Sequence, residues 1–204
     1  MATDLTKLTD AELLDRSAAG EEGAFRELVS RYKNGLYAFL RNFINNRQDI
    51  IDDVFQETFL QLFTSQASFD PTRPLRPWLY TIAANKAKDA LRKLQRTATV
   101  PIGSMTESDE MSFGDMVNVL TAEEERPFDG LEKDETASNV RLVIADMPEN
   151  LREILVFAYF NKFSYKQMAE ALRIPIGTVK SRLHTAVGRF AKDWKAAVRS
   201  KKSQ

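Results

Sequence analysis

The stretch Ser164–Phe190, SYKQMAEALRIPIGTVKSRLHTAVGRF, decides the fold of the C-terminal part of the chain. Ser164 and Gln167 form a capping box that predicts the start of a short helix. The residues 173–175, Arg-Ile-Pro, then predict a tight turn, and a longer helix begins near Ile176. A short helix, a tight turn and a longer helix are typical of a helix-turn-helix.

The longer helix of this motif has two different faces. Its apolar stripe predicts the side that packs on the core, and it consists of Val179, Leu183, Val187 and Phe190. The opposite face carries Ser181, His184, Thr185 and Gly188, with Lys180 and Arg182 beside it. A polar, partly cationic face fits a major groove, although the His184 imidazole could equally be an exposed side chain without a function.

Charge is distributed very unevenly along the 204 residues, although 29 basic and 29 acidic side chains cancel. Residues 1–72 carry 7 Lys or Arg against 12 Asp or Glu, and residues 73–96 carry 7 against 1. Residues 97–137 carry 2 against 11, and residues 138–204 carry 13 against 5. Two basic blocks separated by an acidic segment suggest two contacts with one polyanion, whereas solvated helix faces are the simpler alternative.

The N-terminal block, residues 10–64, has helical spacing throughout and predicts a small helical bundle. Thr9 and Glu12 form a capping box for a first helix that Gly20 ends, and a second helix is expected over residues 24–45. A third helix has an apolar stripe made of Ile51, Val54, Phe55, Thr58, Phe59 and Leu62. Its other face carries Asp49, Asp53, Gln56, Glu57 and Leu60.

The acidic face of this third helix has three interpretations. Carboxylates spaced four residues apart could bind a metal ion, but such a site needs further ligands, and none is evident nearby. The face could also be solvated surface. Because it combines acids, an amide and the apolar Leu60, it equally suits a basic, coiled partner helix.

A basic, aromatic segment follows. The sequence DPTRPLRPW, residues 70–78, contains three prolines and predicts an ordered loop, with Pro77 suited to the first turn of the next helix. Lys86, Lys88 and Arg92 lie on that helix after Phe69, Trp78 and Tyr80. Aromatic rings beside cations can stack on exposed bases while the cations hold phosphates, but core packing of Trp78 and Tyr80 is as consistent with the pattern.

These segments predict an all-α fold of two small helical domains joined by a long linker. The expected boundaries are residues 1–96 for the first domain, 97–137 for an acidic flexible linker and 138–204 for the helix-turn-helix domain. A connection of about 40 residues is improbable inside one compact domain, which favours two domains.

Composition excludes several functions. The chain has no cysteine and a single histidine, so disulfides, thiolate metal sites and a cysteine nucleophile are excluded. We expect no cofactor, no metal and no enzymatic activity. The N-terminus is acidic and amphipathic, without the apolar run of a signal peptide or a membrane span, and we expect a cytoplasmic protein without membrane insertion.

Several stretches, in the same order along the chain, resemble the extracytoplasmic-function (ECF) group of bacterial sigma factors, in the sigma-70 family. These stretches are LTDAELLDRSAAGEEGAFRELVSRY, DDVFQETFLQLF, RPWLYTIAANKAKDALRK, MPENLREILVFAYFNKFSYKQMAEAL and IPIGTVKSRLH. The resemblance covers nearly everything but the linker and the last residues. It implies an alternative sigma factor that binds core RNA polymerase, directs it to specific promoters and helps open the DNA.

The resemblance also implies a role for each surface. It assigns docking on the coiled coil of the largest polymerase subunit to Asp52, Asp53, Gln56 and Glu57. It assigns contact with the minus-ten element, through an extruded base, to Phe69, Trp78, Asn85, Lys86, Lys88, Asp89 and Arg92. It assigns the minus-thirty-five element to Thr178, Lys180, Ser181, Arg182, His184 and Thr185. An anti-sigma factor that masks these surfaces is a further expected partner.

Two positions depart from the pattern of the family. Arg173 stands where the family turn usually has glycine, and a non-glycine residue in a left-handed turn costs on the order of 1 kcal/mol. Thr185 and Val187 stand where arginines often continue the recognition helix, which predicts weaker and less salt-dependent DNA binding.

Two other functions remain open on the residues alone. The first is a helix-turn-helix regulator that binds DNA without polymerase, with residues 10–96 as a sensor or dimerisation domain. The second is a helical metalloenzyme that uses Asp49, Asp53 and Glu57. Specific DNA binding by the isolated chain would favour the first, and stoichiometric bound metal would favour the second.

Overall fold

The computed structural model describes residues 4–45, 47–97 and 132–202, and every regular element within these ranges is a helix. The all-α prediction is therefore confirmed. The N-terminal elements are η1 (Leu5–Lys7), α1 (Asp10–Ala18), α2 (Glu22–Ile44), α3 (Gln48–Ser65), η2 (Gln66–Ser68) and α4 (Leu75–Thr97). The C-terminal elements are α6 (Glu132–Asp146), α7 (Glu149–Tyr159), α8 (Tyr165–Leu172) and α9 (Ile176–Lys202).

The helix ends follow the local sequence closely. The backbone N–H of Thr9 donates to the Glu12 carboxylate at 2.7 Å, and the Thr9 hydroxyl accepts from the Glu12 N–H, so the predicted capping box of α1 is present. Ser164 and Gln167 form the second predicted box at the start of α8. Arg173 ends α8 at φ 52°, in the left-handed region, as the departure from glycine predicted.

The first helical unit is built around α2, which contacts α1, α3 and α4. Five of the six residues in the predicted stripe of α3 are buried, with Ile51 and Leu62 fully inaccessible, and the sixth, Phe55, is half-buried. A Cβ atom at Gly35 of α2 would lie 2.6 Å from the hydroxyl oxygen of Tyr80, so any other residue there would force the Tyr80 side chain to shift. This packing leaves the other face of α3 outside.

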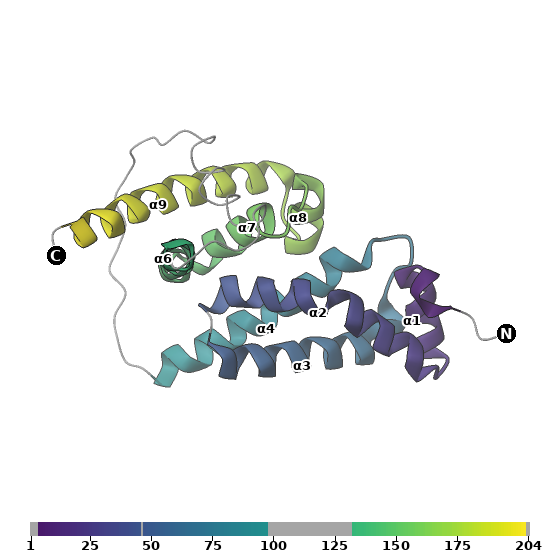
Figure 1. Cartoon of the computed structure of the whole chain (residues 1–204). Coiled ribbons are helices and arrows are strands. Elements are labelled where there is room, and N and C mark those ends of the chain that lie inside the picture. Colours follow the sequence, from purple (N-terminus) through teal and green to yellow (C-terminus); the bar gives the residue numbers. More distant parts are fainter. Residues whose placement is uncertain (1–3, 46, 98–131, 203–204) are drawn as a thin grey trace.

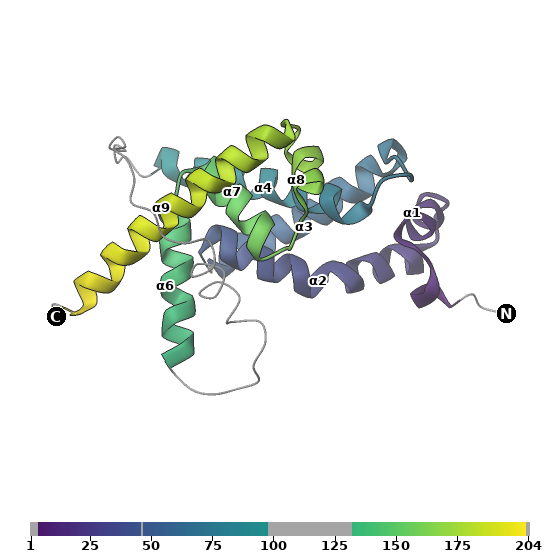
Figure 2. The same cartoon turned by 90° about the horizontal axis from the view of Figure 1, so that it is seen from above.

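In the second unit, α7 and α9 pack together, and α6 and α8 complete the core. Val179, Leu183, Val187 and Phe190, the predicted stripe of α9, are all buried. Figure 1 shows this unit lying above the first, and Figure 2 shows α7 and α8 over the middle of α2 and α4.

The two units share one hydrophobic core. Phe39 of α2 stacks on Phe157 of α7 with ring centroids 5.7 Å apart, and Tyr80 of α4 meets Phe163 edge-on at 5.7 Å. Arg152 of α7 is buried and donates to the carbonyl oxygens of Phe43, Ala145 and Met147. The C-terminal unit is therefore held against α2 and α4 by buried contacts.

The expected linker, residues 97–137, lies mostly outside the described residues, as does the apolar patch at residues 111–120 that the sequence contains there. One difference in boundary is visible at its end. Helix α6 begins at Glu132, so residues 132–137 belong to a helix.

Candidate nucleic-acid interface

The outer face of α3 has the chemistry that the sequence predicted, with one exception. Asp53, Gln56 and Glu57 are exposed. Asp52 is half-buried, and its carboxylate accepts hydrogen bonds from the Tyr37 hydroxyl at 3.0 Å and from Gln48 at 2.8 Å. The Asp52 carboxylate therefore fixes α3 against α2, and three of the four predicted side chains face solvent.

An apolar ridge continues this acidic face toward the C-terminus of α3. Leu60 is 63% exposed and Phe63 is 47% exposed, which is unusual for large apolar side chains. Leu60 belongs to the face predicted from the sequence, whereas Phe63 was not predicted. The signal for Phe63 was its spacing, because a residue three positions after Leu60 lies on the same side of a helix.

The aromatic residues near the proline-rich loop separate into a core residue and a surface pair. Tyr80 is 2% exposed and packs between Phe39 and Phe163, so its ring belongs to the core. Trp78 is only partly buried and stacks on Phe69 with centroids 5.0 Å apart. The alternative that the sequence left open is thus decided for Tyr80, while Trp78 and Phe69 form a stacked pair at the surface.

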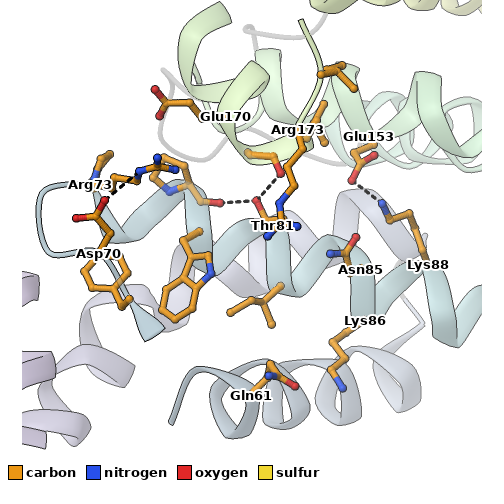
Figure 3. A pocket seen from close by; sticks show the side chains of 18 of the residues that line it. Gln61, Asp70, Arg73, Thr81, Asn85, Lys86, Lys88, Glu153, Glu170 and Arg173 are labelled. Atoms are coloured by element: carbon orange, nitrogen blue, oxygen red, sulfur yellow. Dashed lines mark hydrogen bonds and ion pairs between the residues drawn. The ribbon is translucent and has the colours of Figure 1, made fainter. Parts of the chain in front are cut away.

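This pair lines a groove of about 880 Å³ between α4 and the helix-turn-helix, which Figure 3 shows from close by. Its lining includes most of the predicted minus-ten residues, namely Phe69, Trp78, Asn85, Lys86, Lys88 and Asp89. Thr81 of α4, which the sequence analysis did not single out, also lines it and donates a hydrogen bond to the carbonyl oxygen of Ala171 at 3.2 Å. Arg182 from α9 lines the opposite wall.

The cations of α4 are engaged in ion pairs. Lys86 lies 3.3 Å from Glu57 of α3, which connects the groove with the acidic face. Lys88 pairs with Glu153 of α7 at 2.9 Å. Arg92 pairs with Glu149 of α7 at 2.8 Å and lies 3.6 Å from Asp89. Two of the three predicted DNA-binding cations of α4, Lys88 and Arg92, therefore pair with carboxylates of the second unit.

Glu153 is the most deeply buried acid of this groove. Its side chain is 8% exposed, and that of Lys88 is 16% exposed. Burial raises the pKa of the Glu153 carboxyl, and the hydrogen bond from Lys88 opposes this shift. The upward shift of the pKa means that moving the charged carboxylate out of water costs more free energy than the ion pair with Lys88 contributes.

The outward face of α9 exposes four of the six residues that were predicted to contact the minus-thirty-five element. Lys180, Ser181, His184 and Thr185 are exposed on consecutive turns, and the Thr185 hydroxyl donates to the carbonyl oxygen of Ser181 at 3.0 Å. The Lys180 ammonium lies 5.9 Å from the centre of the Tyr165 ring. Thr178 and Arg182 are partly buried, and Arg182 faces the groove beside α4.

Within residues 4–45, 47–97 and 132–202, no three His, Cys, Asp or Glu side chains gather closely enough to hold a metal ion. None of the helices there has the length and apolar character needed to cross a membrane.

Fold and surface together define a class of protein, a helix-turn-helix protein whose first helical unit carries an exposed acidic face and a basic, aromatic face. Comparison with known proteins agrees. Sigma-70 region 2 matches residues 28–97, and Sigma-70 region 4 matches residues 137–189. The chain is 31% identical to the RNA polymerase sigma-H factor of Pseudomonas aeruginosa over 183 residues, which are 89% of this chain and 92% of that protein.

A second relative is the ECF RNA polymerase sigma-E factor of Haemophilus influenzae, which is 32% identical over 88% of this chain and 92% of that protein. The chain therefore belongs to the ECF sigma factors of the sigma-70 family, and it acts with RNA polymerase in promoter-specific transcription initiation.

Two solved structures have a similar fold. CnrH, in complex with the cytosolic domain of CnrY, aligns with a TM-score of 0.65 over 92% of this chain and 97% of that chain, at 24% identity. The sigma factor RpoE of Bartonella quintana, in complex with the anti-sigma factor NepR, aligns with a TM-score of 0.60 over 84% of this chain and 96% of that chain, at 22% identity.

Proposed function

We propose that the acidic face of α3 docks on a basic coiled coil of the largest subunit of RNA polymerase. Asp53, Gln56 and Glu57 supply acceptors for cationic side chains, and Leu60 and Phe63 supply an apolar strip beside them. A binding surface needs such an apolar centre because exposed ion pairs alone contribute little affinity. The supporting observation is that these large apolar side chains are exposed next to the acids.

Helix α4 and the proline-rich loop bind the minus-ten element in this proposal. The Trp78 and Phe69 rings offer a stacking surface for a base that has left the duplex, and Lys86, Lys88 and Arg92 offer charges for phosphates. Asn85 and Asp89 are exposed on the same helix and supply polar groups for base edges. Binding of an unpaired base would stabilise open DNA, because closed duplex DNA offers the protein no unpaired base to bind.

The helix-turn-helix binds the minus-thirty-five element through α9. Lys180, Ser181, His184 and Thr185 are exposed on one stretch of α9, and a major groove is wide enough to admit an α-helix. Thr178 and Arg182 flank this face, closer to the body of the protein. Phosphate contacts from the cations would set the affinity, and contacts to base edges would set the sequence.

The chain then has two DNA-contacting domains, residues 1–96 and 138–204, which residues 97–137 connect. Two small contacts on one chain gain useful affinity only when a scaffold fixes their spacing, and polymerase supplies that scaffold. The chain then needs no active site of its own, since polymerase performs the synthesis. The protein works in the cytoplasm, where polymerase and promoter DNA are found.

An anti-sigma factor is the remaining partner. Both structural relatives described above were solved in complex with another protein, and that of Bartonella quintana is named an anti-sigma factor. A protein that covers the acidic face or the groove of this chain would block initiation.

The test of the polymerase-binding face is Asp53→Lys, compared with Asp15→Lys. Both residues are exposed on helices of the N-terminal unit and undergo the same change of charge, but Asp15 lies on α1, outside the acidic face. We expect Asp53→Lys to abolish co-purification with core polymerase while its circular dichroism and melting temperature match those of Asp15→Lys. Equal co-purification by the two variants would refute the assigned docking face.

A further inference from the structure

A small apolar pocket lies where the turn between α1 and α2 meets the C-terminal part of α3, and we call it the α1–α2 pocket. Its volume is about 240 Å³, and its lining residues are Ser17, Gly20, Glu22, Phe25, Arg26 and Phe63. The rings of Phe25 and Phe63 meet edge-on in its wall, with centroids 5.2 Å apart. Sites for small molecules usually measure about 300–1,000 Å³, so this pocket is better matched to a single side chain than to a free ligand.

The surroundings of the pocket have the chemistry of a protein interface. The Phe25 ring is only partly buried, although it also packs edge-on against Phe59 at 6.2 Å. At the entrance, Arg26 and Glu22 form an ion pair at 2.8 Å, and both side chains are largely exposed. An apolar centre surrounded by exposed charged groups is the usual arrangement of a hot spot in a protein–protein interface.

The pocket continues the acidic face of α3. Phe63 belongs to the apolar ridge beside that face and also to the pocket wall. Asp53, Leu60 and Phe63 lie within about 80° of one another around α3, and a rise of 1.5 Å per residue separates Asp53 from Phe63 by about 15 Å along the axis. A partner helix that runs along the acidic face therefore reaches the pocket.

This side of the molecule is open to a partner. Figure 1 shows α3 on the side of the N-terminal unit that faces away from α7 and α8. Phe63 is 47% exposed, although a phenylalanine ring is usually buried. The exposed ring and the open pocket beside it therefore form one apolar surface that the chain itself does not cover.

We infer that the α1–α2 pocket binds one large apolar side chain of the same polymerase helix that docks on the acidic face. This inference rests on the proposed function of α3. The partner helix then carries a cation for Asp53 and, about ten residues away, a leucine or an aromatic residue that enters beside Phe25 and Phe63. The buried side chain contributes more affinity than the charged contacts, because exposed ion pairs contribute little.

One experiment measures whether polymerase covers the pocket. The chain has no cysteine, so a single introduced thiol reports on one position. Arg26→Cys places this thiol at the pocket, and Asp15→Cys is the control, because Asp15 is exposed on α1 about 200° around the helix from Ser17. The rate of alkylation by iodoacetamide is measured by mass spectrometry of this chain, with and without saturating core RNA polymerase.

We expect polymerase to slow the alkylation of Arg26→Cys by about tenfold or more, because the contacts around a filled pocket exclude water and the reagent with it. Asp15→Cys should react at the same rate in both conditions. Equal protection of both thiols would show a general covering of this end of the chain and would overturn the inference. Protection of Arg26→Cys on concentrating the chain without polymerase would also overturn it, because the occupant would then be a second copy.

The outcome for the acidic face separates this inference from the proposed function. If Asp53→Lys abolishes co-purification with polymerase while Arg26→Cys reacts equally fast with and without polymerase, the docking face stands and the pocket is not part of it. If Asp53→Lys still co-purifies with polymerase, the docking face is wrong and the inference about the pocket falls with it.

A second experiment changes the wall of the pocket. Phe25→Leu alters the wall without touching the outward face of α3, and Phe190→Leu is the matched control, because it makes the same replacement inside the C-terminal unit. Circular dichroism verifies that both variants are folded. We expect Phe25→Leu to bind core polymerase about 5-fold more weakly or worse, which is the loss that marks an energetically important interface residue. Equal affinities of the two variants would contradict the inference.

Discussion

The stacking of Phe39 on Phe157 can be tested by a double-mutant cycle across the two helical units. Both rings are buried, and their centroids lie 5.7 Å apart at an interplanar angle of 24°. Replacing each ring by leucine keeps most of the apolar volume, so each single variant is expected to cost about 1 kcal/mol and to remain folded. A ring pair of this geometry is worth about 0.5–1.5 kcal/mol beyond its buried area, which is the coupling energy that we expect for Phe39→Leu with Phe157→Leu.

The assay is denaturant unfolding followed by tryptophan fluorescence. The chain has two tryptophans, Trp78 in the N-terminal unit and Trp194 in the C-terminal unit, so both units are reported. The control cycle combines Phe39→Leu with Phe190→Leu. Phe190 is equally buried but stacks on Trp194 inside the C-terminal unit, so this cycle is expected to be additive within about 0.5 kcal/mol. If the Phe39 and Phe157 cycle is also additive, the described packing of the two units is refuted.

Three further predictions concern a pH effect, a turn and a DNA contact. Burial raises the pKa of Glu153 above its ordinary value of 4.5, with Lys88 of α4, Arg182 of α9 and Glu149 of α7 facing it, so the folded chain binds this proton more tightly than the unfolded chain. The stabilisation that this proton provides is complete below about pH 4.5 and is lost as the pH rises through the folded-state pKa. The unfolding free energy of the natural chain minus that of Glu153→Gln should therefore fall with rising pH. A difference that does not depend on pH would contradict this prediction. Arg173→Gly should raise the unfolding free energy by about 0.5–1 kcal/mol, because Arg173 has a φ of 52°. Gly20→Ala, at a φ of 93°, should lower the unfolding free energy by about 1 kcal/mol. A decrease for Arg173→Gly together with an increase for Gly20→Ala would show that these turns are misassigned. Lys180→Ala should reduce the slope of log affinity against log salt by about 0.9 for polymerase-bound protein on a promoter fragment, and Lys195→Ala, on the same helix, should leave it unchanged; equal slopes for both variants would remove Lys180 from the contact.

Local features were predictable from the sequence because neighbouring residues determine them. The capping boxes at Thr9 and Ser164 and the left-handed Arg173 depend only on side chains and backbone within one turn, and all three are present. The buried stripes of α3 and α9 follow from spacing, since any helix buries its apolar side when a core is available.

Contacts between distant segments were not predictable in the same way. The spacing predicted that Lys88 lies on the polar face of its helix, but it could not show whether the ammonium meets water, a phosphate or a carboxylate. The carboxylate that it meets belongs to Glu153, 65 residues further along the chain. Tyr80 and Trp78 are two residues apart beside the same loop, yet Tyr80 is in the core and Trp78 borders the groove, because Phe39 of α2 and Phe163 both pack on the Tyr80 ring. Asp53 is exposed, whereas Asp52, one position earlier, is half-buried and accepts hydrogen bonds from Tyr37 of α2 and from Gln48.

The most direct test of the account is run-off transcription from genomic DNA fragments by core RNA polymerase, with and without this protein. We predict discrete start sites that appear only when the protein is supplied and that disappear with Asp53→Lys but persist with Asp15→Lys. The same start sites in its absence, or tight and specific binding of those fragments by the protein without polymerase, would contradict the account.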